Sequence, residues 1–347
     1  MTTATAHRLE GLEPDNLLAF LALLGLLRAL EAAGWRPRAH WEGLPLRPVL
    51  TLREAKTQEQ VAQAAAEGCM VLAKDHDFDG EKDLTFQGER ARSLLEAAQR
   101  PDTPGRSALL GSLFSDGAIN KNGVVIQSPL CPMKSGTGHQ HFLQRLCEVP
   151  VLDTVTHAVT QDKSTRVRPN RAVKQTETVP ASQSTANGRQ RGADIRKALY
   201  LPWSYLDKTP AFRWDPSEDR RYALRFGDPG NTSRNPIRTV HGANRLAAVG
   251  LAALPSAAVQ RASQVILLNI GSEKFGPRDD RISWPIWRFS CSLPALQALI
   301  AHPAIVAQAP DKRSLALFGI TEVRRARRIE KKVAAGVYVN FTRGEVV

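Results

Sequence analysis

The chain has 347 residues, 42% of them hydrophobic, so it is long enough to bury one large core or two ordinary ones. Lys and Arg outnumber Asp and Glu by 47 to 34, giving a formal net charge of +13 and a pI near 10.0. This excess favours a polyanionic partner, nucleic acid before an anionic membrane surface. The four cysteines are widely spaced and form no CxxC pair, which excludes a zinc ribbon and a disulfide framework.

A long apolar helix is predicted near the start of the chain, in "NLLAFLALLGLLRALEAAGW" (16–35). Asp15 is expected to cap its first turn, and Gly34 to end it. Leucines recur on nearly every face, so other elements should surround this helix. Arg28 and Glu31 interrupt the apolar run before it reaches the ~20 residues that a bilayer crossing needs. With acidic residues before the helix instead of a secretory signal, we expect a cytoplasmic protein without a membrane partner.

Apolar spacing and turn residues predict the other elements in chain order. Strands are expected at 6–12, 38–53 (one or two strands), 122–130, 264–271, 281–290 and 337–343, and helices at 57–74, 88–100, 242–258, 293–303 and 314–336. This mixture indicates an α+β fold that is helix-rich, with short antiparallel strands.

Three regions follow from the composition. Residues 1–153 are expected to form an N-terminal α+β region around the apolar helix, and residues 198–347 a C-terminal α+β region that ends in a basic helix. Between them, residues 154–197 hold nine basic and three acidic residues and few large apolar side chains. Such a segment cannot bury enough surface to order itself alone, so we expect a basic flexible loop or linker.

Three basic stretches are candidate nucleic-acid-binding sites, because Arg and Lys neutralise phosphates and Arg makes forked contacts with them. In the central segment the candidates are Lys163, Arg166, Arg168, Arg171, Lys174, Arg189 and Arg191; in "NPIRTVHGANR" they are Arg234, Arg238, Asn244 and Arg245; and in "VRRARRIEKK" they are Arg324, Arg325, Arg328, Lys331 and Lys332. On the helix predicted for the last stretch, these cations lie near one face and would repel one another without an anion opposite.

The second of these stretches differs from the preceding "WDPSEDRRYALR", whose acidic residues are close enough in sequence to neutralise its arginines. In "NPIRTVHGANR" the arginines have no such compensation. We expect Arg245 to contact the phosphate backbone. Asn244 either reads a base edge or caps the helix that follows, and the sequence leaves both open.

An acidic loop between two predicted helices carries Asp75, Asp77 and Asp79 at alternate positions. The spacing is similar to the first half of a calcium loop, but Phe86 stands where the bidentate acid would be. No phosphate-binding loop motif and no nucleophile elbow occurs. We therefore predict no cofactor, no metal and no catalytic residue, with a metal-dependent nuclease at this loop as the alternative.

Four blocks of sequence, "LEGLEPDNLLAFLALLGLLRALE", "WDPSEDRRYALR", "TVHGANRLA" and "SWPIW", occur in that order between residue 9 and about residue 290. Together they resemble the large subunit of a type I CRISPR effector complex (Cascade), nearest to subtype I-G, formerly I-U. The central segment and the acidic loop have no counterpart in this resemblance.

The resemblance implies a non-enzymatic subunit of an RNA-guided antiviral defence complex. Its partners would be guide RNA, target double-stranded DNA, the other Cascade subunits and the helicase-nuclease that the complex recruits. Base pairing reads the target in such complexes, while protein reads the short flanking motif (the PAM) and holds the backbone. A different structural subunit of the same complex is a further alternative.

Overall fold

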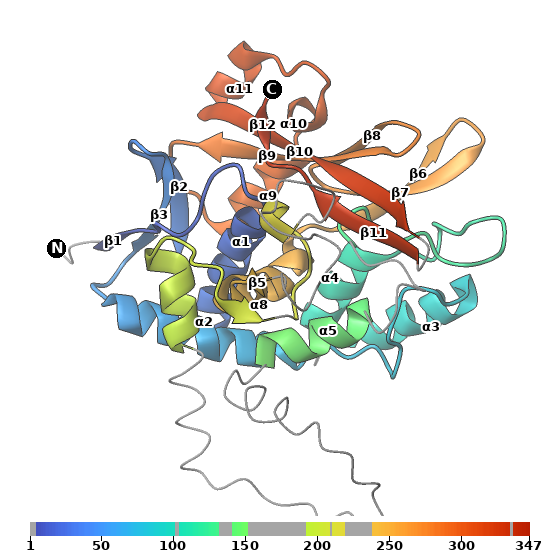
Figure 1. The fold of residues 1–347 in the computed structure, drawn as a ribbon, viewed down its shortest axis with the longest axis horizontal. Coiled ribbons are helices and arrows are strands. Elements are labelled where there is room, and N and C mark those ends of the chain that lie inside the picture. Colours follow the sequence, from blue (N-terminus) through green and yellow to red (C-terminus); the bar gives the residue numbers. More distant parts are fainter. Residues whose placement is uncertain are drawn as a thin grey trace, which may run out of the picture.

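The computed structural model describes residues 5–100, 104–131, 141–151, 192–208, 210–218, 238–333 and 336–347. These residues form an α+β fold in which helices pack against antiparallel sheets (Figure 1). The predicted fold class is therefore confirmed.

The N-terminal half supplies a small sheet and most of the helices (Figure 1). Its elements are β1 (Thr5–Arg8), α1 (Leu17–Ala32), β2 (Arg38–Glu42), β3 (Arg47–Leu52), α2 (Gln58–Ala73), α3 (Gly88–Ala98), α4 (Pro104–Leu113), α5 (Phe142–Glu148) and the 3-10 turn η1 (Val149–Val151). The strands pair antiparallel in the order β1-β3-β2. Residues 192–200, where the described part of the chain resumes after residue 151, are helical.

The C-terminal half supplies a larger antiparallel sheet in the order β11-β10-β9-β8, with β12 also paired to β10. Its elements are β4 (Asp207–Lys208), η2 (Pro216–Glu218), β5 (Arg238–Thr239), α8 (His241–Gly250), η3 (Leu251–Ala253), β6 (Ser256–Arg261), β7 (Gln264–Asn269), β8 (Ser272–Gly276), β9 (Asp279–Trp287), α9 (Leu293–Ala301), α10 (Pro303–Val306), α11 (Lys312–Leu317), β10 (Ile320–Val333), β11 (Gly336–Phe341) and β12 (Glu345–Val346). β4 pairs with β5, and β6 with β7.

Helix α1 lies at the centre of the molecule and is buried on almost all sides, as its leucines predict (Figure 1). Its N-cap is Asn16 rather than the predicted Asp15, since the Asn16 Oδ1 accepts hydrogen bonds from the backbone N–H groups of Leu18 and Ala19. The helix ends at Ala32 with Ala33 as its C-cap, and Gly34, the next residue, has a positive φ of 83°. The Gly34 N–H donates to the Glu31 carbonyl and the Trp35 N–H to the Leu30 carbonyl, which is the bonding pattern of a Schellman motif.

The two halves share one hydrophobic core, because α1 crosses α8 at very short range. A Cβ added to Gly25 of α1 would stand 1.7 Å from the carbonyl oxygen of Leu246 in α8. A Cβ added to Gly250 of α8 would stand 2.3 Å from the Leu21 carbonyl oxygen. The crossing therefore depends on glycine in both helices.

The helix predicted for 314–336 is wrong: after the short α11 the chain forms β10, the longest strand of the larger sheet. It pairs with β9 on one side and with β11 and β12 on the other. The strand predicted at 122–130 is reduced to isolated bridges of Val124 and Val125 with Gln87 and Ile119. Of the expected flexible segment 154–197, only residues 192–197 are described, and these are helical.

The other predicted helices and strands are present. The strands expected at 6–12, 38–53, 264–271, 281–290 and 337–343 correspond to β1, β2 with β3, β7, β9 and β11, and the helices expected at 57–74, 88–100, 242–258 and 293–303 correspond to α2, α3, α8 and α9. The helix at 242–258 is shorter than expected, because η3 and the strand β6 follow Gly250. No helix of the described ranges has both the length and the apolar character needed to cross a bilayer.

Candidate nucleic-acid interface

The first candidate group lies outside the described residues. Its members are Lys163, Arg166, Arg168, Arg171, Lys174, Arg189 and Arg191. Arg234, which belongs to the second group, also lies outside the described residues. Their expected contacts with nucleic acid stay predictions.

The described members of the second group mostly face inward, against the expectation of a ligand-facing surface. Asn244 is 0% exposed and Arg245 1% exposed. The Asn244 Oδ1 accepts from the Phe212 N–H at 3.1 Å, and its Nδ2 donates to the Thr239 Oγ1 at 2.8 Å and the Val240 carbonyl at 3.0 Å. Asn244 therefore holds the loop before α8 in place and neither caps the helix nor reaches solvent.

Arg245 turns its guanidinium toward the helical residues 192–200, where its Nη2 lies 3.6 Å from the Asp194 Oδ2. Burial raises the pKa of the Asp194 carboxyl, while the Arg245 cation lowers it. Arg238 is half-buried in β5, and its Nη1 donates to the Leu206 carbonyl at 3.4 Å. These contacts give Arg245 a structural role, because a phosphate cannot reach a side chain at this depth.

The third group is in strand β10, and most of its described side chains are used inside the protein. Arg325, which is 5% exposed, donates to the Ser283 Oγ and to the carbonyls of Ile305, Ala307 and Gln308 at the end of α10. These carbonyls have no partner within their short helix, so Arg325 caps it.

Arg328 and Arg324 pair with acidic residues. Arg328 is 9% exposed and pairs with Glu330, and Asp280 lies 3.9 Å away. Arg324 pairs with Glu322 at 2.6 Å. Lys331 and Lys332 belong to the same strand, but their side chains lie outside the described part of the structure. The common face predicted from helical spacing does not exist, since successive strand residues point to opposite sides of the sheet.

The acidic loop is neutralised within the molecule. The Arg106 Nη1 lies 3.4 Å from the Asp77 Oδ2, and the Arg90 Nη2 lies 2.9 Å from the Asp79 Oδ2. Burial raises the pKa of Asp75, which the nearby Arg28 cation opposes. Because Asp77 and Asp79 pair with different arginines, the loop does not turn its carboxylates toward one point. No group of three or more His, Cys, Asp or Glu side chains suited to a metal gathers among the residues with described positions.

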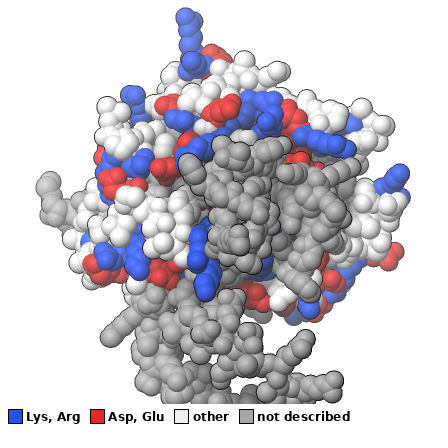
Figure 2. Space-filling model, viewed as in Figure 1, with Lys and Arg blue, Asp and Glu red and all other residues white. Residues whose placement is uncertain are grey.

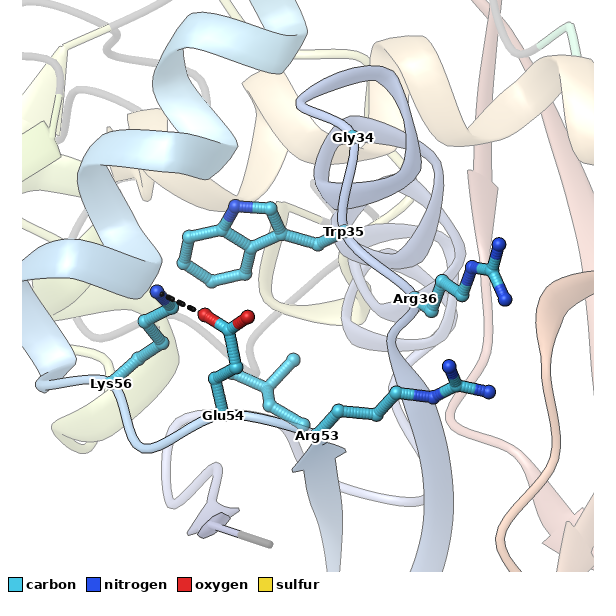
Figure 3. Close-up of a pocket in the computed structure, with 7 residues that line it drawn as sticks. Gly34, Trp35, Arg36, Arg53, Glu54 and Lys56 are labelled. Carbon is cyan, nitrogen blue, oxygen red and sulfur yellow. Dashed lines mark ion pairs between the residues drawn. The ribbon is translucent and has the colours of Figure 1, made fainter. Parts of the chain in front are cut away.

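A different basic site, which the sequence did not single out, lies where α1 ends and the small sheet begins (Figure 3). Arg36 and Arg38 come from the entry to β2, and Arg53 follows the end of β3. The antiparallel pairing of Arg38 with Thr51 brings these two stretches together. The Schellman turn at Gly34 sets where Trp35 and Arg36 leave the helix.

Two adjoining hollows of about 240 and 490 Å³ lie here, and Arg38 lines only the larger one. Trp35, Arg36, Leu52 and Arg53 line both. Glu54 is held by Lys56, whose Nζ lies 2.8 Å from the carboxylate and 5.3 Å from the Trp35 ring centroid. Figure 3 shows Arg36 and Arg53 extending to the same side, away from that ion pair.

The three arginines are exposed, and none forms an ion pair with a carboxylate of the described ranges. On the face that Figure 2 shows, Lys and Arg lie beside Asp and Glu over much of the described surface. Two ion pairs of the described residues are Arg90 with Glu81 and Arg261 with Glu273, each at 2.9 Å. The site beside Trp35 therefore combines three arginines that have no ion-pair partner among the described residues with a concave shape.

The chain matches no protein-family model, and no curated protein matches it. The assignment of a function therefore depends on the residues described above and on the resemblance noted in the sequence.

Proposed function

We propose that this protein is a non-catalytic nucleic-acid-binding subunit of an RNA-guided complex. The observation that carries the proposal is the group of Arg36, Arg38 and Arg53, three exposed cations around one concave surface, none of which forms an ion pair with a carboxylate of the described residues. Like charges held this close repel one another, so an anion that bridges them lowers the energy of the arrangement. A phosphate backbone supplies that anion, and the positive electrostatic potential of a chain of net charge +13 attracts it further.

The type of complex comes from the sequence. The four ordered blocks resemble the large subunit of a type I CRISPR effector complex, nearest to subtype I-G. In that role the chain would contact guide RNA and target double-stranded DNA, read the flanking motif, join the other Cascade subunits, help recruit the helicase-nuclease and work in the cytoplasm. The burial of Asn244 and Arg245 removes them from the reading of the motif and leaves it to exposed residues.

The nuclease alternative gains no support from the acidic loop, where Asp77 and Asp79 each pair with a different arginine. A water nucleophile activated by a metal needs several ligands that converge on one ion. The proposal therefore keeps the protein non-catalytic and gives chemistry on the nucleic acid to a partner.

The test is a binding titration of the purified full chain with guide RNA and with a DNA duplex at several salt concentrations. We expect log Kd to rise linearly with log salt concentration, because every neutralised phosphate releases counterions. On a single strand, the triple variant Arg36→Gln, Arg38→Gln, Arg53→Gln should lower that slope by about two units, at roughly 0.7 per phosphate. A Kd of the wild-type protein that stays constant from low to physiological salt contradicts the proposal.

A further inference from the structure

The two hollows beside Trp35 differ in the chemistry of their walls. The smaller one ends at the Glu54–Lys56 ion pair, which neutralises itself. The larger one adds Pro37, Thr51 and Pro294, so it has an apolar wall beside the three arginines. Arg36 and Arg53 stand at the junction of the two.

This arrangement separates a place for a negative charge from a place for a flat apolar group. Guanidinium groups bind a phosphate through forked hydrogen bonds, and Arg36, before the start of β2, and Arg53, after the end of β3, extend to the same side, where both can approach one phosphate. Pro294, which is exposed, and Pro37 and Leu52, which are largely buried, line this hollow with carbon atoms against which a ring can pack. Glu31 also lines this hollow, and its carboxylate would repel a second phosphate but accept a hydrogen bond from an amino or hydroxyl group.

We propose that the larger hollow holds one nucleotide of an unpaired strand, with its phosphodiester between Arg36 and Arg53 and its nucleoside against Pro37, Leu52 and Pro294. A base within a duplex is stacked on both sides and cannot turn its face to a protein wall, whereas a base in a single strand can. This inference rests on the proposed function and deepens it, because it names the form of nucleic acid and its site.

The experiment measures fluorescence anisotropy of a labelled 12-nucleotide single strand and of the matching duplex with the full chain. The variant is Arg36→Gln with Arg53→Gln, and the matched control is Arg100→Gln, an exposed arginine beyond the end of α3. We expect the double variant to bind the single strand about tenfold or more weakly at low salt, because it loses two charge-assisted phosphate contacts. Duplex binding should fall less, and the control should bind both ligands as the wild type does.

A second readout is the emission of Trp35, which lines the hollow. It is obtained by subtracting the tryptophan emission of a Trp35→Phe variant from that of the wild type. This difference signal should change when the single strand is added. Because Arg36 and Arg53 are exposed, the double variant should keep the wild-type thermal midpoint.

Several results would overturn this assignment. If the double variant binds the single strand as tightly as the wild type, the hollow is not the site, and the binding of nucleic acid by the wild type takes place at another surface. An equal loss on strand and duplex would make it a duplex-backbone contact instead. Competition by a free nucleoside monophosphate at micromolar concentration would indicate a small-molecule site. A wild-type protein that binds neither ligand refutes the proposed function and this inference together.

Discussion

The close crossing of α1 and α8 leads to a specific prediction for Gly25, because alanine normally stabilises a helix more than glycine does. Gly25→Ala should gain up to about 1 kcal/mol from helix propensity. Against this, the new Cβ would stand 1.7 Å from the Leu246 carbonyl oxygen and 2.4 Å from its carbonyl carbon, far inside an ordinary contact. Both atoms belong to the backbone of a helix, so neither can rotate away as a side chain can.

The two helices must therefore move apart by more than an ångström, which loosens contacts along the most buried face of α1. Overpacking of this kind typically costs about 1–3 kcal/mol, and a clash with helix backbone belongs at or above the upper end. We expect a net destabilisation of about 2 kcal/mol or more after the gain in propensity. Urea unfolding followed by far-UV circular dichroism would show it as a lower midpoint with an unchanged slope.

Gly111→Ala is the matched control, because Gly111 is also in a helix but has no atom within 4 Å of the position of an added Cβ. Here only the propensity term remains, and we expect a gain of roughly 0.5–1 kcal/mol. If both variants gain stability to a similar extent, the close crossing of α1 and α8 is refuted.

Two further predictions concern buried polar groups. His76 is buried and hydrogen-bonds the Leu146 carbonyl through its Nδ1, and burial lowers its pKa to about 4. The unfolded chain takes up this proton near pH 6.5, so stability should fall as the pH drops from 6.5 toward 4. In urea titrations across that range, His76→Gln should flatten the fall, and an equally steep fall in the variant would contradict the assignment. Asn244→Ala should cost about 1–3 kcal/mol, because the Phe212 N–H and the Thr239 hydroxyl lose a buried partner. Its affinity for nucleic acid should equal that of the wild type, and a stable variant with weakened binding would restore Asn244 as a contact residue.

Much of the fold follows from hydrophobic periodicity, and helix α1 shows why. A run with leucine on every face is stable in water only where other elements cover it, so both its helical form and its full burial can be predicted. The same reasoning predicts β2 and β3, whose β-branched and aromatic residues lie between turn-forming ones.

Strand β10 lies where a helix is predicted, and on that helix its basic residues would lie near one face. A shared basic face is expected only when the charges face solvent, and here Arg325 and Arg328 are buried. Arg325 reaches three carbonyls at the end of α10, and Arg328 pairs with an acid two residues further along its own strand. The spacing of basic residues along the sequence cannot predict that an arginine will bind such carbonyl groups.

The site beside Trp35 is a candidate site that the sequence did not predict. Arg36, Arg38 and Arg53 look ordinary in sequence, since two short stretches contribute them and neither is a basic run. The predicted strands did contain the signal, because a hairpin between 38 and 53 brings its two ends together. Whether those cations meet a carboxylate depends on side-chain placement, which composition does not reveal.

The core shared by the two halves has a consequence for how the chain can be divided. Val149 and Ile195, on either side of residues 152–191, belong to the same core, and the Leu199 carbonyl accepts a hydrogen bond from the Gly11 N–H at 3.0 Å. A polypeptide broken between residues 151 and 192 would give two fragments, each with apolar helix faces that only the other covers. Such fragments should be insoluble when expressed separately and should copurify when expressed together. A protease cut in this interval, or a split of the coding sequence there, would leave one folded particle with four chain ends.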